Sequence, residues 1–266
     1  MSSDAISGSG PEIDESVPHS ARIWNYWQGG KDFYPVDREA GDQYVAVFPG
    51  IVDIAKGMRY FLVRSVRYLA GEAGVTQFLD VGTGLPTADN THQIAQQVNP
   101  AARVVYVDND PTVLAHARAL LTSTPEGATA YIDTNMSDTG VVLVEAAKTL
   151  DLSRPVAVTI NGVLGHTNDY DVALSIVRGL IDNLPSGSYL AFSDSTTEDE
   201  AFNQAQAGYD DTGAVPYKLW TPDEIAGMFD GLELVEPGLV PIPMWRPAPG
   251  DDPQALPTLA GVGRKP

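Results

Sequence analysis

The sequence of 266 residues contains no cysteine. This absence excludes disulfide frameworks, thiolate nucleophiles, cysteine-based zinc sites and iron–sulfur clusters. Histidine is also scarce, because only His19, His92, His116 and His166 occur and none lies three or four residues from another. A local His-x-x-x-His metal motif is therefore missing, and we expect no metal. The chemistry must come from histidine, carboxylates, hydroxyls, amides or a bound cofactor.

Positive charge is in short supply as well. Sixteen Lys and Arg residues stand against 35 Asp and Glu residues, which gives a formal net charge of -19. A phosphate-rich partner is repelled by such a chain, so we expect no nucleic-acid partner. No apolar run approaches the roughly 18 residues of a membrane-spanning helix, and the first residues do not form a secretion signal. We expect a cytoplasmic protein without a membrane partner, and leave a homodimer open.

The chain divides into three parts by composition. Residues 1–18 are rich in Ser, Gly, Pro and acids, which predicts a disordered tail. Residues 19–74 predict a helical cap, with helices from Ser20 to Gly29-Gly30, at 37–48 and at 51–70. Residues 75–266 predict a Rossmann-like domain that forms one compact unit with this cap.

Strands and helices alternate after residue 74. Apolar runs predict strands at 76–81, 103–108, 129–133, 156–162 and 188–194, and helices at 87–98, 112–121, 138–150 and 169–184. The C-terminal part predicts a helix at 222–230 and an antiparallel hairpin of 232–236 with 258–263, whose Pro-rich tip 237–257 is either a loop or a lid. This order is typical of an α/β fold with a doubly wound, mostly parallel sheet, which binds ligands at the carboxyl ends of its strands.

The strongest motif is the stretch from Phe78 to Thr87, which reads FLDVGTGLPT. Gly82 and Gly84 allow a tight turn and a close approach of the backbone to a ligand, and the following helix offers free N–H groups. Thr87 stands where a dinucleotide fingerprint has its third glycine. The motif therefore favours a nucleoside with a smaller charged group over a pyrophosphate.

Two acids follow at the ends of the next strands. Asp108 lies 24 residues after Gly84 and can accept hydrogen bonds from both ribose hydroxyls. The alternative is a helix cap, a role that Asp110 fits better. Asp133 ends the third strand, where it either accepts from an adenine amino group or is a solvated turn acid.

At these residues the chain resembles the seven-stranded S-adenosylmethionine-dependent methyltransferases, and among them an actinobacterial S-adenosyl methyltransferase family. The most specific stretches are SARIWNYWQGGKD at 20–32 and the residues at 77–90, 104–132 and 229–240. The resemblance implies a sheet in the order 3-2-1-4-5-7-6 with an antiparallel last strand. It also implies S-adenosylmethionine as cofactor and S-adenosylhomocysteine as product.

The same resemblance implies roles for individual residues. Those that touch the cofactor would be Gly82, Thr83 and Gly84 at the methionyl part, Asp108 at the ribose, Asn109 at the adenine face, and Asp133 with Thr134 at the adenine edge. Gly30 and Lys31 would close over the pocket, and Tyr26 would reach the cofactor carboxylate. Alternatively, Lys31 is a surface cation and Trp24 or Trp27 only packs in the core.

One stretch departs from the family pattern. After the fourth strand the family usually shows Val-Leu-His, whereas this chain reads TINGVLGH from Thr159 to His166. The histidine has moved by one place, and Asn161, which we assign to the cofactor site, replaces an apolar residue. Either the substrate has changed, or catalysis is altered or lost. His166 is then a general base or a structural histidine.

Aromatic residues after the strand ends are candidates for the acceptor site, each with core packing as the alternative: Phe33, Tyr34, Tyr170, Tyr209, Tyr217 and Trp220. We expect a methyltransferase that acts on a small-molecule acceptor of specialised metabolism by in-line displacement. One alternative is a non-catalytic protein that binds S-adenosylmethionine or S-adenosylhomocysteine. Another is a nicotinamide-dependent oxidoreductase, against which Thr87 and the N-terminal helices count.

Overall fold

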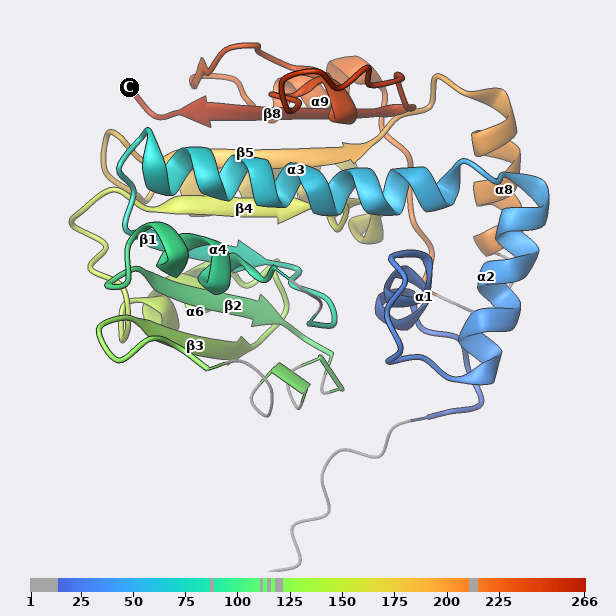
Figure 1. Cartoon of the computed structure of the whole chain (residues 1–266), viewed down its shortest axis with the longest axis horizontal. Coiled ribbons are helices and arrows are strands. Elements are labelled where there is room, and N and C mark those ends of the chain that lie inside the picture. The colour runs from blue at the N-terminus through green and yellow to red at the C-terminus, as the bar shows by residue number, and fades with distance from the viewer. Residues whose placement is uncertain (1–13, 87–88, 111, 114–115, 118–121, 211–214) are drawn as a thin grey trace, which may run out of the picture.

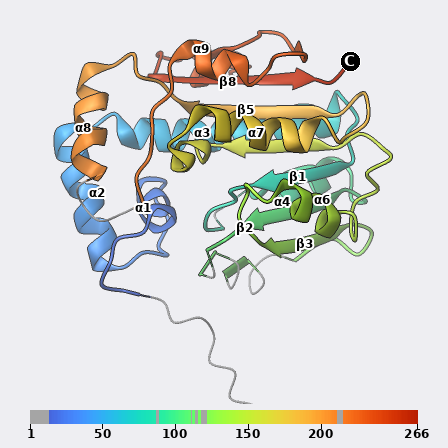
Figure 2. The same cartoon turned by 180° about the vertical axis from the view of Figure 1, so that it is seen from behind.

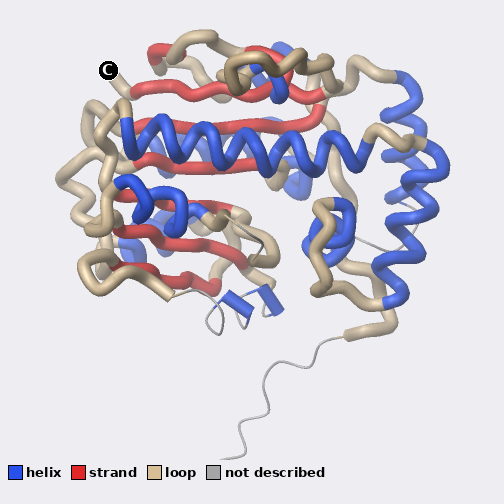
Figure 3. The backbone as a smooth tube through the Cα atoms, viewed as in Figure 1, coloured by secondary structure: helices blue, strands red, loops and turns tan. Residues whose placement is uncertain are grey.

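The computed structural model describes residues 14–86, 89–110, 112–113, 116–117, 122–210 and 215–266. One sheet in the order β3-β2-β1-β4-β5-β8-β6 forms its centre, and β7 pairs with β8 (Figures 1 and 3). The strands are β1 (Gln77–Val81), β2 (Arg103–Asp108), β3 (Ala128–Asp133), β4 (Ala157–Asn161), β5 (Tyr189–Ser195), β6 (Glu233–Leu234), β7 (Val240–Pro241) and β8 (Thr258–Arg264). The first five strands are parallel, and β8 runs antiparallel to β5. The predicted fold class and strand order are confirmed, since β8 is the seventh predicted strand.

Helices cover both faces of the sheet. One face carries α3 (Ile51–Gly71) and α4 (Thr91–Val98), and the other carries α6 (Thr139–Ala146), α7 (Tyr170–Ile181) and α9 (Pro222–Gly227) (Figures 1 and 2). Successive strand residues point to opposite faces, so Phe78 packs under α3 whereas Leu79 belongs to the core beneath α7. Burial on both faces explains why these strands are apolar throughout rather than alternating.

The helix after β1 begins later than the sequence pattern suggests. Asn90 forms a capping box with Gln93, whose side chain accepts the Asn90 N–H at 2.9 Å, so α4 starts at Thr91 instead of Thr87. Residues 82–86 and 89–90 therefore lie in loop structure between β1 and α4. Thr87 itself, and much of the helix predicted at 112–121, lie outside the described residues.

A helical layer lies beyond the carboxyl ends of the strands (Figure 1). It consists of α1 (Ser20–Trp27), α2 (Pro35–Val47) and α8 (Glu200–Asp210). Tyr44 of α2 packs edge-on against Trp27 of α1 and Tyr209 of α8, with ring centroids 5.2 and 5.7 Å apart. No helix was predicted at α8, which joins the two predicted cap helices although it follows them by about 150 residues in the sequence.

Asp37 holds the start of this layer together. Its carboxylate accepts hydrogen bonds from Arg22 Nε at 2.7 Å and from the N–H groups of His19 and Tyr34 at 2.9 and 2.8 Å. Arg22 also donates to the Val17 carbonyl at 2.6 Å. One buried carboxylate thus joins α1, α2 and the segment that precedes them.

The Pro-rich stretch 237–257 is more ordered than a plain loop. It contains β7 and the short 3-10 helix η2 (Ile242–Met244), and Trp245 beyond them is completely buried. Arg64 of α3 donates to the carbonyl oxygens of Trp245 and Ile242 at 2.7 and 2.8 Å. The stretch therefore fastens α3 to the antiparallel edge of the sheet, and the predicted hairpin of β6 with β8 is present.

None of the helices in the described part of the chain combines the length and the apolar character that crossing a membrane requires.

Candidate functional site

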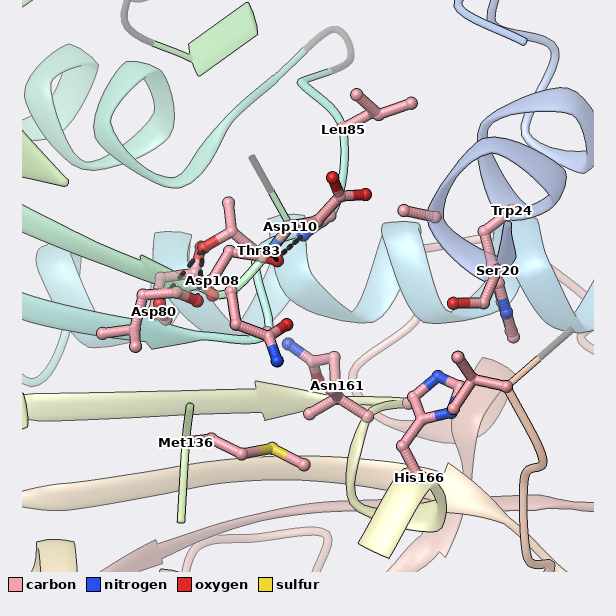
Figure 4. Close-up of a pocket in the computed structure, with 18 of the residues that line it drawn as sticks. Ser20, Trp24, Asp80, Thr83, Leu85, Asp108, Asp110, Met136, Asn161 and His166 are labelled. Carbon is pink, nitrogen blue, oxygen red and sulfur yellow. Dashed lines mark hydrogen bonds between the residues drawn. The ribbon is translucent and has the colours of Figure 1, made fainter. Parts of the chain in front are cut away.

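A cavity of about 460 Å³ opens between α1 and the carboxyl ends of the parallel strands. Its walls come from α1, α3 and the loops that follow β1, β2, β3 and β4 (Figure 4). This volume is in the usual range of small-molecule sites, roughly 300 to 1,000 Å³. The cavity lies where an open α/β sheet binds its ligands.

The loops after β1 and β2 form one wall. Gly82 and Gly84 adopt φ angles of 70° and 64°, which favour glycine, and Gly82 N–H donates to the Val107 carbonyl at 2.9 Å. Asp108 accepts hydrogen bonds from the N–H groups of Gly84 at 3.0 Å and Asp110 at 2.9 Å. Burial raises the pKa of Asp108, although these two hydrogen bonds oppose the shift. The residues at the two strand ends thus form one connected surface.

Asp80 lies deeper in the same wall. Its two carboxylate oxygens accept from the hydroxyls of Thr91 at 2.6 Å and Thr159 at 2.7 Å. Burial raises its pKa, and the nearby Arg59 guanidinium partly offsets that effect. A carboxylate buried at this depth stays ionised only if such partners compensate for its lost hydration.

Arg59 of α3 brings a positive charge to the cavity. It is half-buried, and burial lowers the pKa of its guanidinium, which Asp80 and Asp89 counteract. No role was predicted for Arg59 or Asp80 from the sequence. The available signal was a basic residue beside the apolar positions Met58 and Leu62 in the middle of a helix that packs on the sheet.

Asn161 and His166 stand on the β4 side of the cavity, and His166 lies nearer than Asn161 to Ser20 and Trp24 of α1 (Figure 4). Asn161 ends β4, and its side-chain oxygen accepts from the Ser193 hydroxyl at 2.9 Å. His166 lies in the 3-10 helix η1 (Leu164–Thr167), with Nδ1 3.1 Å from the Pro216 carbonyl oxygen. The histidine therefore faces the cavity at its α1 end.

Eight of the predicted site residues line this cavity: Gly82, Thr83, Gly84, Asp108, Asn109, Thr134, Asn161 and His166. Four predicted cofactor residues lie outside its lining. Lys31 and Asp133 are exposed, and the Tyr26 hydroxyl donates to Asp42 on α2. At Gly30 a Cβ would lie 2.1 Å from the Asn25 side-chain oxygen, so this glycine allows close packing within the cap.

The predicted acceptor residues are more scattered. Trp220 is completely buried and donates its indole N–H to Asp194 at 3.3 Å, and Tyr170 packs edge-on against it. Tyr34 lies under the Arg22 guanidinium at the start of α2. Tyr209 lines a second, smaller cavity of about 20 Å³, whose wall shares Ser20, Trp24 and His166 with the main one. Of the predicted aromatic residues, Tyr209 and Tyr217 line this smaller cavity, and none lines the main one.

Comparison with known protein families identifies the chain. The S-adenosyl methyltransferase family matches residues 7–266. The chain belongs to this family. Among curated proteins, none matches the sequence.

Solved structures agree with this assignment. A DUF574 family protein from Streptomyces avermitilis is 45% identical, with a TM-score of 0.90 over 96% of this chain and 100% of that one. A candidate methyltransferase from Thermobifida fusca is 40% identical, with a TM-score of 0.87 over 96% and 97%. The plantazolicin methyltransferase BpumL, solved with S-adenosylhomocysteine, is only 12% identical, with a TM-score of 0.50 over 92% and 95%, and shows the fold alone.

The methyltransferase uses S-adenosylmethionine as cofactor, and transfer of its methyl group leaves S-adenosylhomocysteine. The cavity fits this molecule in size and in chemistry. A Cβ placed on Gly84 would meet no atom within 4 Å, so the backbone lies open to a ligand. Three lining carboxylates, Asp80, Asp108 and Asp110, suit a ligand with a sulfonium and an ammonium group, and Arg59 suits its carboxylate.

Proposed function

We propose that this methyltransferase transfers the methyl group to a small-molecule acceptor by in-line displacement within the cavity at the strand ends. The observation that carries the proposal is the connected wall of Gly82, Gly84 and Asp108, closed opposite by α1. A cavity of this size suits small molecules, and bound cofactor and acceptor together would exclude water from the reaction.

Different residues of the wall would contact different parts of the cofactor. Asp108 would hold the ribose hydroxyls, and Asn109 and Thr134 would contact the adenine. Gly82, Thr83 and Gly84 would lie along the methionyl part, with Asn161 opposite. Arg59 would pair with the methionyl carboxylate, since it lines the cavity whereas Lys31 and Tyr26 do not.

The cofactor supplies a methyl group already activated by the sulfonium, so the protein contributes mainly alignment and exclusion of water. A bond from the acceptor atom to the methyl carbon forms as the carbon–sulfur bond breaks, and sulfur keeps the electron pair. Where the acceptor atom carries a proton, that proton must leave. His166 faces the cavity and would accept it.

Calorimetric titration with S-adenosylmethionine, S-adenosylhomocysteine and NAD tests the cofactor site. We expect both sulfur compounds to bind and NAD not to bind. Asp108→Ala should weaken the binding of both at least about tenfold, because a bidentate ribose contact is lost. Asp182→Ala, an exposed aspartate after α7, is the matched control and should bind like the wild type.

An unchanged affinity in Asp108→Ala would refute the assigned site. Methyl transfer from labelled S-adenosylmethionine to a panel of hydroxyl, amine and carbon acceptors tests the reaction itself. Cofactor binding without transfer to any acceptor would favour a non-catalytic binding protein instead.

A further inference from the structure

A network of contacts connects the end of β5 with His166. Asp194 in β5 is completely buried and accepts hydrogen bonds from the Tyr217 hydroxyl and, at 3.3 Å, from the Trp220 indole N–H. It also accepts the N–H of Ser195 at 2.7 Å. Tyr217 and Trp220 belong to one segment, 215–220, so a single carboxylate anchors this segment at two points.

The anchored segment holds His166 in turn. The Lys218 N–H donates to the Gly165 carbonyl at 2.9 Å, and the Tyr217 ring packs edge-on against the imidazole with ring centroids 4.9 Å apart. The Pro216 carbonyl oxygen lies 3.1 Å from His166 Nδ1. Because a carbonyl oxygen only accepts, this hydrogen bond needs a proton on Nδ1, and Nε2 is then the basic nitrogen of the neutral ring.

Gly165 explains why the histidine stands one place later than in the usual family pattern. A Cβ at this position would lie 2.5 Å from Cε1 of Tyr217 and 2.6 Å from the Lys218 carbonyl oxygen. Tyr217 therefore occupies the space that a side chain at 165 would need. The histidine at 166 faces the cavity beside the tyrosine.

We infer that Asp194 and Tyr217 are positioning residues, which hold His166 through the Pro216 carbonyl in the tautomer whose Nε2 accepts a proton from the methyl acceptor. The inference rests on the proposed function, in which His166 takes that proton. It also narrows the substrate class, because such a base serves acceptors with a hydroxyl or N–H group and not thioethers or tertiary amines. The proton moves from the acceptor atom to Nε2 as the new bond to carbon forms.

Four aromatic residues lie around the small space beside His166. His166 lies on the wall that the main cavity shares with the smaller one, and the smaller cavity is lined by Trp24, Tyr44, Phe202 and Tyr209. With about 20 Å³, this space admits a group of roughly methyl size beside the acceptor's nucleophile.

The tautomer can be measured by long-range ¹H–¹⁵N NMR on full-length protein labelled with ¹⁵N-histidine. The chain has only four histidines, and His166→Ala assigns the signal. At about pH 8.5, above the usual histidine pKa of about 6.5, we expect a wild-type ring protonated on Nδ1. In Tyr217→Phe and Asp194→Asn we expect a mixture with the ring protonated on Nε2. Tyr189→Phe, a buried tyrosine at the opposite end of β5, is the control and should keep the wild-type tautomer.

Two results would overturn the inference. One is a wild-type ring protonated on Nε2, and the other is an unchanged tautomer in both Tyr217→Phe and Asp194→Asn. Titration of the same samples with S-adenosylhomocysteine separates this inference from the proposed function. A wild type that fails to bind it would refute the cofactor site, whereas the NMR signal reports the histidine in either case.

Discussion

The two walls of the cavity are built in different ways. The wall after β1 and β2 comes from two neighbouring strand ends, and hydrogen bonds such as that from Gly84 N–H to the Asp108 carboxylate hold it together. The facing wall combines α1, η1 and the segment 215–220, which meet only through packing and long-range hydrogen bonds. A local motif thus builds the first wall, which we call the cofactor wall. The second, which we call the acceptor wall, depends on the whole fold. Changes in the two walls should therefore have separable effects on cofactor affinity, stability and turnover.

The largest effect, on the free energy of unfolding, is expected at the ion pair that attaches α1 to α2. Asp37→Ala would leave Arg22 buried without its partner, since the two side chains are 0% and 5% exposed. Breaking such a pair costs about 3 to 5 kcal/mol. Urea denaturation should show this loss in the free energy of unfolding.

Glu145→Ala is the matched control for Asp37→Ala, because the Lys148–Glu145 pair is exposed. Its removal should change the free energy of unfolding by no more than about 1 kcal/mol. Similar losses in the two variants would show that the buried pair does not hold α1 in place.

The second prediction separates the methionyl end of the cofactor wall from its nucleoside end. Arg59→Met should weaken S-adenosylmethionine binding about 10- to 100-fold, the value of a lost charge-assisted hydrogen bond. Binding of 5′-methylthioadenosine, which lacks the amino acid part, should stay near the wild-type value. Equal losses for the two ligands in calorimetry would remove Arg59 from the carboxylate site.

The cofactor wall was the more predictable of the two. Short apolar runs fix the parallel strands, and glycines at 82 and 84 mark the turn at a strand end, so Asp108 falls beside them in any such sheet. The role of Arg59 was not predicted from these patterns. Its role depends on how α3 is rotated over the sheet, which the sequence pattern does not give.

The acceptor wall was predicted poorly because its residues lie far apart in the sequence. Trp220 is an aromatic residue of the kind that often contacts a substrate, yet it is buried against Asp194 of β5. The helix α8 is polar enough to resemble a loop and is recognised only through the packing of Tyr209 on Tyr44. Aromatic residues in such connections serve packing and binding alike, and the sequence does not separate the two.

The third prediction concerns the anchor of the acceptor wall and its dependence on pH. Burial raises the pKa of Asp194 to about 7, against about 3.9 in an unfolded chain. The folded state therefore binds this proton more tightly, so the contribution to stability is complete below about pH 4 and is lost as the pH rises toward 7. The loss is at most about 1.4 kcal/mol per pH unit.

Asp194→Asn should remove this dependence, because the amide does not titrate. Denaturation of wild type and variant at several values between about pH 4 and 7 isolates the contribution of Asp194 from that of the other acids. If the free energy of unfolding varied with pH in the same way in both proteins, the Asp194 carboxylate would already be ionised at low pH.

The smallest effect should come from His166→Ala, measured as cofactor affinity. His166 lies on the β4 side, away from the glycine turn and Asp108, so the dissociation constants of S-adenosylmethionine and S-adenosylhomocysteine should change by less than about twofold, or about 0.4 kcal/mol. Methyl transfer to a hydroxyl or N–H acceptor should fall, because the proton acceptor is gone. If affinity and turnover fell together, His166 would belong to the cofactor wall, and the separation of the two walls would fail at the residue where they meet.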